Sequence, residues 1–459
     1  MASSKPIRIE PSSLKHGGTI VLPRAQMKEF NLTPGSYTLA FGQKNASVRL
    51  RSSDRPEPDV VRVSSDLIHA LHLPVGEQLS LYRNGEQIGF GYLFGILANL
   101  KTDGDQVCGS QQKVFRNLLQ SAHSLQMYGY VFSVAGIDWE SQTVLGYRLE
   151  DETRWANKRL PLPDVVYDQI ISRTYINKSE VAQARERLMR LVASRYFNPG
   201  YFDKWQVQRW LKNDRRTAAY MPDAIRFESV EQSAPFLYQY SDVYLKPVHG
   251  SLGIGIIRAR RRPDGRVFYQ IKKKDGSLRQ EYSGSVSVFL KKFQVRLKKG
   301  PYMIQRTLRL KNWQGRPFDI RILLQKDGTG SWQRTKMFCR IAQHGQITSN
   351  LSSGGDALAV KQLLQDMYDG ILVRKIIRQL REVAEAIPLA IEQGGIGTVG
   401  ELGLDLGLDE EGRIWVIEVN AKPWKKPNTE DGEWRDLAQL AFQRPVQYAK
   451  YLCETALNR

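Results

Sequence analysis

The stretch GLDLGLDEEGRIWVIEVN, residues 403–420, decides the fold of this chain. Two apolar runs flank Asp409-Glu410-Glu411-Gly412, and this pattern predicts two strands joined by a tight turn. Because side chains alternate along a strand, Glu418 and Asn420 share one face, where their oxygens are able to meet the carboxylate of Asp405. Such an all-oxygen set suits Mg²⁺, with Mn²⁺ as the alternative ion. The competing interpretation is a solvated hairpin with an acidic turn.

A lysine followed by a glycine loop forms the second pattern. The segment 244–256 reads YLKPVHGSLGIGI, so a strand delivers Lys246 into a loop that carries Gly250, Ser251, Gly253 and Gly255. Glycine lets backbone N–H groups approach a phosphate closely, and the ammonium group neutralises its charge. The loop lacks the Walker A ending, and an ordinary surface hairpin also uses glycine freely.

Two arginines in apolar strands form the third pattern. Arg321 lies in the middle of the strand expected at 317–324, where an unpaired charge is costly. Arg340 lies in the next apolar run. Planar guanidinium groups pair bidentately with phosphate or carboxylate, which predicts an anion site. A local ion pair between Arg321 and Asp319 is the structural alternative.

In this order the patterns resemble the ATP-grasp superfamily, over residues 200–430. The chain looks closest to the endospore-coat-associated YheC/YheD-type family, and it is also similar to RimK-type ligases and bacterial glutathione synthetases. Motifs of the YheC/YheD type extend the resemblance over most of the chain: Phe197-Asn198-Pro199-Gly200, Asp203-Lys204-Trp205, Phe318-Asp319-Ile320-Arg321, residues 400–405 and residues 415–423. One position departs from the D-alanine–D-alanine ligase branch, because Gly403 stands where that branch has an arginine.

The resemblance implies roles for the candidate residues. Lys246 and a second lysine, either Lys272 or Lys273, would bind the α- and β-phosphates of ATP. The backbone of Ile304 and the side chain of Gln305 would meet the adenine. Mg²⁺ would be held by the hairpin set described above. Residues around the transferred phosphate would act in catalysis through an acyl phosphate: Arg321, Arg340, Asn350, Gly354 and Gly355.

Length and composition limit the class of protein. The chain has 459 residues, which suits two to four domains, and its 41% hydrophobic and 25% charged residues are ordinary for a globular protein. Three widely separated cysteines fit neither a disulfide framework nor a zinc site. No apolar run is long enough for a bilayer, and the first residues lack a secretory signal. We therefore expect a cytoplasmic protein, and the resemblance to the YheC/YheD-type family implies an association with the spore coat.

Alternating strand and helix patterns predict an α/β (α+β) fold. Residues 1–95 are expected to form a β-rich accessory domain, and residues 96–200 a small α/β domain of the kind that precedes an ATP-grasp domain. Residues 201–459 are expected to form the nucleotide-binding, catalytic ATP-grasp domain.

Charge suggests the kind of partner. The net charge is +20, and the segment 246–311 contains 18 lysines and arginines against three acidic residues. Such a basic segment attracts polyanions. We interpret the chain as an ATP-dependent carboxylate–amine, or carboxylate–thiol, ligase in a sporulation context. Its carboxylate and amine substrates stay unidentified, and an acidic peptide or polymer suits the charge.

Two other functions remain open. The chain could be a non-catalytic, ATP-binding structural protein that contacts spore-coat proteins. It could also be a nucleic-acid-binding module, which the scarcity of aromatic residues within the basic segment disfavours.

Overall fold

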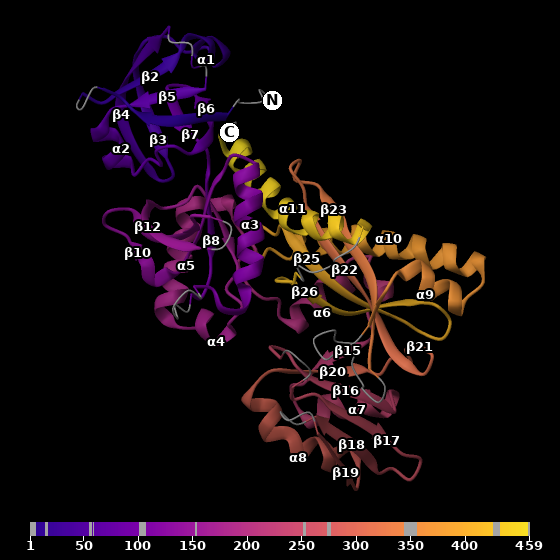
Figure 1. Ribbon diagram of the computed structural model, residues 1–459. Helices are drawn as coiled ribbons and strands as arrows, with labels where there is room; N and C mark the ends of the chain where they lie inside the picture. The colour runs from indigo at the N-terminus through magenta and orange to yellow at the C-terminus, as the bar shows by residue number, and fades with distance from the viewer. Residues whose placement is uncertain are drawn as a thin grey trace.

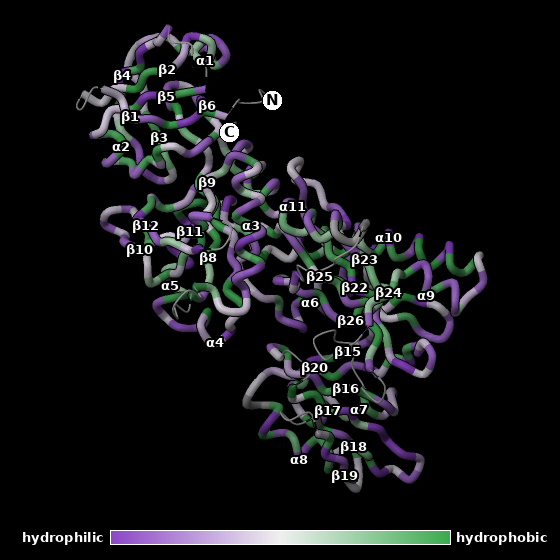
Figure 2. The backbone as a smooth tube through the Cα atoms, viewed as in Figure 1, coloured by the Kyte–Doolittle hydropathy of each residue, from purple (hydrophilic) through white to green (hydrophobic). Residues whose placement is uncertain are grey.

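The computed structural model describes residues 6–13, 17–54, 57, 59–100, 107–151, 154–250, 254–272, 277–343, 356–425 and 432–457. Figure 1 shows four parts along the molecule. We call them the barrel, the second domain, the lid sheet with its helices, and the central sheet with its helices. In Figure 2 the hydrophobic stretches follow the strands inside each part, which is where the cores lie.

The barrel is built from β1 to β7, which close in the order β1-β5-β2-β4-β3-β7-β6. Closure leaves no unpaired strand edge. Ile7 and Ile9 point inward while their neighbour Arg8 points out, as strand alternation requires. The barrel ends at Phe90, before the boundary expected at residue 95. Its elements are β1 Pro6–Pro11, β2 Thr19–Pro23, α1 Arg24–Glu29, β3 Gly35–Phe41, β4 Lys44–Ser53, β5 Val60–Val63, α2 Ser65–Leu71, β6 Gln78–Asn84 and β7 Gln87–Phe90.

The second domain is an open α/β sheet in the order β10-β11-β9-β8-β13-β14, with β12 paired to β11. Strands β9, β8, β13 and β14 run parallel, and β8, β9 and β13 are buried throughout, as expected for parallel strands covered on both faces. Helices α3 and α11 cover one face and α5 covers the other. The elements are β8 Leu93–Leu97, α3 Gln112–Ser124, β9 Tyr128–Phe132, β10 Ile137–Asp138, β11 Thr143–Leu149, β12 Trp155–Pro161, β13 Val165–Asp168, α4 Arg173–Ile176, α5 Ser179–Val192 and β14 Tyr196–Phe197.

The lid sheet is antiparallel, in the order β15-β20-β16-β17-β18-β19. One face packs beneath α7 and α8, where Phe289 and Phe293 meet Leu245, Tyr269 and Ile304. The alternate residues face away from this core. The elements are β15 Ala224–Arg226, α7 Val230–Gln239, β16 Asp242–Pro247, β17 Ile257–Arg261, β18 Val267–Lys272, β19 Leu278–Ser283, α8 Val286–Lys299 and β20 Tyr302–Arg306.

The central sheet is antiparallel, in the order β24-β23-β22-β25-β26, with β21 paired to β22. The hairpin expected at residues 403–420 is present as β25 and β26. Ile320, Leu404 and Leu406 pack against α9 and α10 on one face, so residues between them in sequence face the opposite side. The elements are α6 Lys204–Asn213, β21 Asn312–Trp313, β22 Arg316–Lys326, β23 Trp332–Ile341, β24 Asp356–Leu358, α9 Val360–Met367, α10 Gly370–Gln393, β25 Glu401–Leu408, β26 Ile414–Asn420 and α11 Gly432–Leu457.

Helix α11 joins two parts of the molecule. Figure 1 shows it lying beside α3, and its residues Phe442, Val446 and Leu452 share a core with Phe115 of α3 and Phe94 of β8. The end of the chain therefore completes the core of the second domain. Among the described residues, no helix combines the length and apolar character needed to span a bilayer.

Candidate functional site

A pocket lies where the lid sheet, the central sheet and the second domain meet. Lys246, Met303 and Gln305 line it from the lid sheet, and residues 416–421 line it from β26 and the loop that follows. Arg173 and residues 201–208 complete its wall. Four of the residues singled out from the sequence line this pocket: Lys246, Gln305, Glu418 and Asn420.

Lys246 and Gln305 project from neighbouring strands of the lid sheet. The Lys246 ammonium group donates a 2.5 Å hydrogen bond to Gln305 Oε1. Burial and the nearby Lys204 lower the pKa of Lys246 to about 8, although Glu418 opposes them. Ile304 lies between Met303 and Gln305, the two pocket residues of β20, so its side chain faces the core of the lid.

The glycine loop is described only in part. Gly255 has φ +82°, a conformation that favours glycine, and its carbonyl accepts a 3.3 Å hydrogen bond from the Tyr302 hydroxyl. Gly250 closes the turn after Pro247. Lys272 ends β18. Some predicted residues lie outside the described part of the chain: Ser251, Gly253, Lys273, Asn350, Gly354 and Gly355.

The β25–β26 hairpin places the three oxygen donors on one face. Asp405 pairs with Glu418 and Gly403 with Asn420, and side chains of paired residues point the same way. The register shifts after Asp405, so Ile417 is the extra residue of a bulge. Asn420 Nδ2 donates a 3.4 Å hydrogen bond to Asp405 Oδ2.

Both carboxylates of this set have basic partners. Glu418 is hydrogen-bonded and ion-paired to Lys204 from α6. Asp405 is hydrogen-bonded to Arg321 and lies 3.0 Å from the Arg340 guanidinium. The donor set has the all-oxygen chemistry that Mg²⁺ prefers, and its members lie on adjacent strands beside a pocket, so these residues fit the ion.

Arg321 and Arg340 lie on the same face as Asp405. Arg340 grips Asp319 with two hydrogen bonds of 2.6 and 2.7 Å, because the register of β22 and β23 sets these residues opposite each other. Burial disfavours its charge, but Asp319 and Asp405 outweigh this and raise the pKa of Arg340. The alternative considered for Arg321 was a local ion pair with Asp319. The structure shows Arg321 hydrogen-bonded to Asp405 across the strand pair.

The structure gives a reason for glycine at position 403. A Cβ atom built there would lie 2.8 Å from Pro423 Cβ and 3.5 Å from an Arg321 guanidinium nitrogen. The space above this residue is thus occupied by the loop after β26.

Two cationic residues that line the pocket, Lys204 and Arg173, were given no role from the sequence. Lys204 belongs to the Asp203-Lys204-Trp205 motif but had no assigned role, and its contact with Glu418 joins residues 214 positions apart. Arg173 extends from α4 and donates a 3.2 Å hydrogen bond to the carbonyl of His249 in the glycine loop. Neither contact has a sequence signal, apart from the position of Lys204 beside the N-cap residue Asp203.

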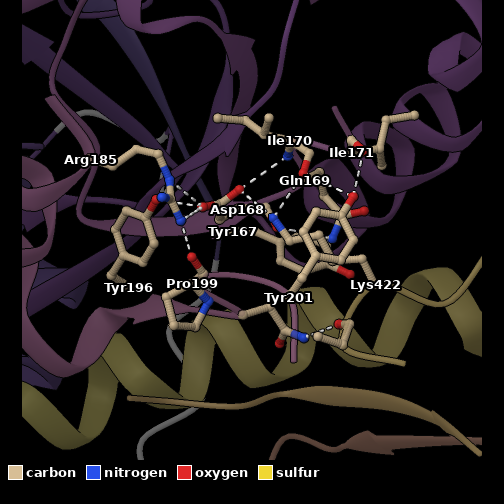
Figure 3. A network of polar contacts seen from close by, with 12 residues as sticks. Tyr167, Asp168, Gln169, Ile170, Ile171, Arg185, Tyr196, Pro199, Tyr201 and Lys422 are labelled. Atoms are coloured by element: carbon tan, nitrogen blue, oxygen red, sulfur yellow. Dashed lines mark hydrogen bonds and ion pairs between the residues drawn. The ribbon is translucent and has the colours of Figure 1, made fainter. Parts of the chain in front are cut away.

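A buried ion cluster fixes the loop that follows Asn420. Asp168 ends β13 and is fully buried. It accepts hydrogen bonds from Lys422 at 2.6 Å, from Arg185 at 2.7 Å and from the Tyr196 hydroxyl at 2.7 Å. Figure 3 shows these groups converging on the carboxylate. Burial alone would raise the pKa of Asp168, but Lys422 and Arg185 hold it below its ordinary value.

Two further clamps join the second domain to the hairpin. The side chain of Asn198, whose backbone has φ +56°, donates to the carbonyls of Glu401 at 3.0 Å and Ala421 at 2.7 Å, and accepts from the amide of Gly400 at 2.8 Å. Lys425 is buried and donates to the Tyr167 hydroxyl of β13 at 2.8 Å and to Glu401 of β25 at 2.7 Å. The second domain therefore holds both ends of the β25–β26 hairpin in place.

Comparisons with known proteins agree with these patterns. Residues 193–452 match the family described as YheC/D like ATP-grasp. The chain is 28% identical over 445 residues to the endospore coat-associated protein YheD of Bacillus subtilis strain 168, covering 96% of this chain and 95% of that protein. It is 26% identical over 274 residues to the endospore coat-associated protein YheC of the same organism, covering 59% and 74%.

Solved structures with similar folds include D-alanyl-alanine synthetase A of Vibrio cholerae O1 biovar eltor. The match has 10% sequence identity and a TM-score of 0.46, and it covers 80% of this chain and 99% of that one.

Proposed function

Because the chain belongs to the YheC/D-like ATP-grasp family, we propose that it is an ATP-dependent ligase that joins a carboxylate to an amine or a thiol. One observation carries the proposal. A single pocket gathers lysines from the lid sheet and α6 together with oxygen donors from the central sheet. A nucleotide with its metal ion requires this combination of cationic and anionic groups.

Lysines would bind the phosphates. Lys246 projects into the pocket, and Lys204 lies close enough to lower its pKa, so the two ammonium groups form one positive region. An anion placed between them would relieve their mutual repulsion. Gly250 and Gly255 shape the covering loop, and Lys272 at the end of β18 is our candidate for the second lid lysine.

The oxygen donors would hold Mg²⁺. Asp405, Glu418 and Asn420 present two carboxylates and an amide on one face of the hairpin. When bound, the ion would offset the negative charge of the phosphates. Lys204 and Arg321 orient the two carboxylates through the ion pairs already described.

The arginines would stabilise charge on the reacting phosphate. Arg340 is buried and fixed by two bonds to Asp319, so its guanidinium is oriented before any ligand arrives. Arg321 lies beside it on the same face. Donors that are fixed in advance stabilise developing charge with little reorganisation, which is the largest contribution in many enzymes.

The relatives suggest a biological setting. Both curated relatives are named endospore coat-associated proteins, so we place the ligase in sporulation. The excess of basic residues in the segment 246–311 supports an acidic peptide or polymer as the substrate.

Phosphate release from Mg²⁺-ATP tests the proposal. The wild type and Glu418→Gln are compared with amino acids and acidic peptides as substrates. We expect substrate-dependent ADP and phosphate from the wild type, loss of activity in Glu418→Gln, and unchanged activity in the matched control Glu410→Gln, whose side chain is exposed in the hairpin turn. Equal rates in all three proteins would refute the assignment of Glu418.

A second candidate function rests on the ion pairs of the hairpin. Asp405 and Glu418 both have basic partners, which would also suit a nucleotide-regulated structural protein. Tight binding of Mg²⁺-ATP without phosphate release for any substrate would favour that function.

A further inference from the structure

A basic groove runs over the outer surface of α9 and α10. It has a volume of about 730 Å³ and is lined by Ile371, Ile377 and five cations: Lys361, Arg374, Lys375, Arg378 and Arg381. All five cationic side chains are exposed, and none has a hydrogen bond or ion pair to another described residue. On α10, residues 374, 378 and 381 follow helical spacing, so their charges form one stripe.

This groove lies away from the nucleotide pocket. The buried faces of α9 and α10 pack against Ile320, Leu404 and Leu406 of the central sheet. Asp405 and Arg321 alternate with these residues and point to the other side. Figure 1 shows α9 and α10 at the right-hand margin, apart from the lid strands. The groove is therefore separate from the pocket proposed for the nucleotide.

A second hollow continues the groove toward the end of α10. Its volume is about 650 Å³, and it shares Arg381 with the first hollow. Trp332, Leu389 and Glu385 line it, and Glu392 marks its end on the helix. From Ile371 to Glu392 the helix rises about 32 Å, the length of an extended peptide of about ten residues.

The lining identifies the chemistry of the occupant. Ile371 is 75% exposed and Leu389 41% exposed, so aliphatic groups flank the basic stripe. Nucleic acid offers phosphates for the arginines but few apolar groups to cover Ile371 and Leu389. Its uniform negative charge would also be repelled by Glu385 beyond the stripe. A polypeptide is able to pair carboxylates with the arginines and apolar side chains with the aliphatic groups. We infer that this groove docks an acidic polypeptide segment that alternates carboxylate and apolar side chains.

The inference does not depend on ligase activity. Exposed ion pairs each contribute at least about 0.2 kcal/mol, so removing four cations is expected to weaken binding at least about fourfold. Binding should also weaken as salt rises, because exposed charges are screened.

Fluorescence anisotropy of the full chain tests the site. The probes are a labelled 12-residue peptide of Glu and Leu, the same peptide with Gln for Glu, and single-stranded DNA of equal charge. One variant neutralises the stripe: Arg374→Gln, Lys375→Gln, Arg378→Gln and Arg381→Gln. Its control removes four exposed cations elsewhere: Lys28→Gln, Arg49→Gln, Arg51→Gln and Lys113→Gln. A third variant, Ile371→Ser, removes the apolar contact, and Arg374→Gln/Arg378→Gln serves if the fourfold variant fails to fold.

We expect the Glu/Leu peptide to bind the wild type and the control equally, and the stripe variant at least about fourfold more weakly. Ile371→Ser should weaken binding of the Glu/Leu peptide and leave DNA binding unchanged. Equal loss in the stripe variant and the control would show non-specific charge attraction. DNA binding as tight as the peptide and lost with the stripe would make the groove a nucleic-acid site. Either result, or no binding of the Glu/Leu peptide, overturns the proposal.

Discussion

Replacing Asp168 by asparagine removes the only carboxylate bonded to both Lys422 and Arg185 among the described residues. Both side chains stay enclosed, since Lys422 is 1% exposed and Arg185 11% exposed. Asparagine keeps the size of the side chain and still accepts hydrogen bonds. The substitution therefore tests the charge of Asp168 rather than its packing.

Breaking a buried ion pair by removing one partner typically costs about 3–5 kcal/mol. Burial already lowers the pKa of Lys422, and Asp168 opposes this, so losing the carboxylate disfavours the charged ammonium further. By contrast, Lys422→Met leaves Asp168 bonded to Arg185 and Tyr196. It removes the Lys422 hydrogen bonds to Asp168 and to the Ile170 carbonyl but also the cost of burying the ammonium group, so it should cost about 1.5–3 kcal/mol.

Urea unfolding followed by circular dichroism measures these differences in the free energy of unfolding. The control is Arg154→Gln, which breaks an exposed pair with Glu150 whose side chains are 69% and 48% exposed. That pair should contribute less than about 1 kcal/mol. The reasoning fails if Asp168→Asn costs no more than the control, or if Lys422→Met costs more than Asp168→Asn.

Four further predictions follow from the site. Because the pKa of Lys246 is about 8 and the charged form binds phosphate, calorimetry should show ATP affinity falling as the pH rises through 8, and Lys246→Met should abolish this dependence. Gly403→Ala should lower thermal stability and ATP affinity, because its Cβ would lie 2.8 Å from that of Pro423; unchanged values would contradict the packing. In Asn198→Ala, the loss of free energy of Mg²⁺ binding, measured by titration, should exceed the loss of free energy of unfolding obtained from the melting temperature. The lowered pKa of Asp168 predicts stability that is present above about pH 4 and lost as the pH falls toward its folded pKa, in acid titrations followed by circular dichroism.

Local patterns in the sequence sufficed for the strands and their faces. Alternation between Leu404, Asp405 and Leu406 separates a core face from a polar face, and the structure has this separation. The turn chemistry after Leu408 predicts the hairpin for a similar reason, since both signals lie within a few residues.

These local patterns do not identify ion-pair and hydrogen-bond partners that are distant in sequence. Lys204 and Glu418 are 214 positions apart, and Asp168 and Lys422 are 254 apart. Alternation tells which face a side chain occupies, but the identity of its partner depends on how whole sheets pack. For this reason the sequence indicated an anion site at Arg321, with an ion pair to Asp319 as the alternative, whereas the cross-strand register places Asp405 opposite it.

The position of α11 has a consequence for synthesis on the ribosome. Phe94 and Phe115 of the second domain share a core with Phe442 and Val446, which are translated last. At about 5–20 residues per second, the 263 residues between Asp168 at the end of β13 and Gly432 at the start of α11 take about 13–53 s to emerge. During this interval α3 alone covers that face of the second domain, and a nascent chain in this state is a natural client for chaperones. Ribosome-bound chains halted before residue 432 should accordingly be cleaved by protease within the second domain, whereas chains released at full length should resist.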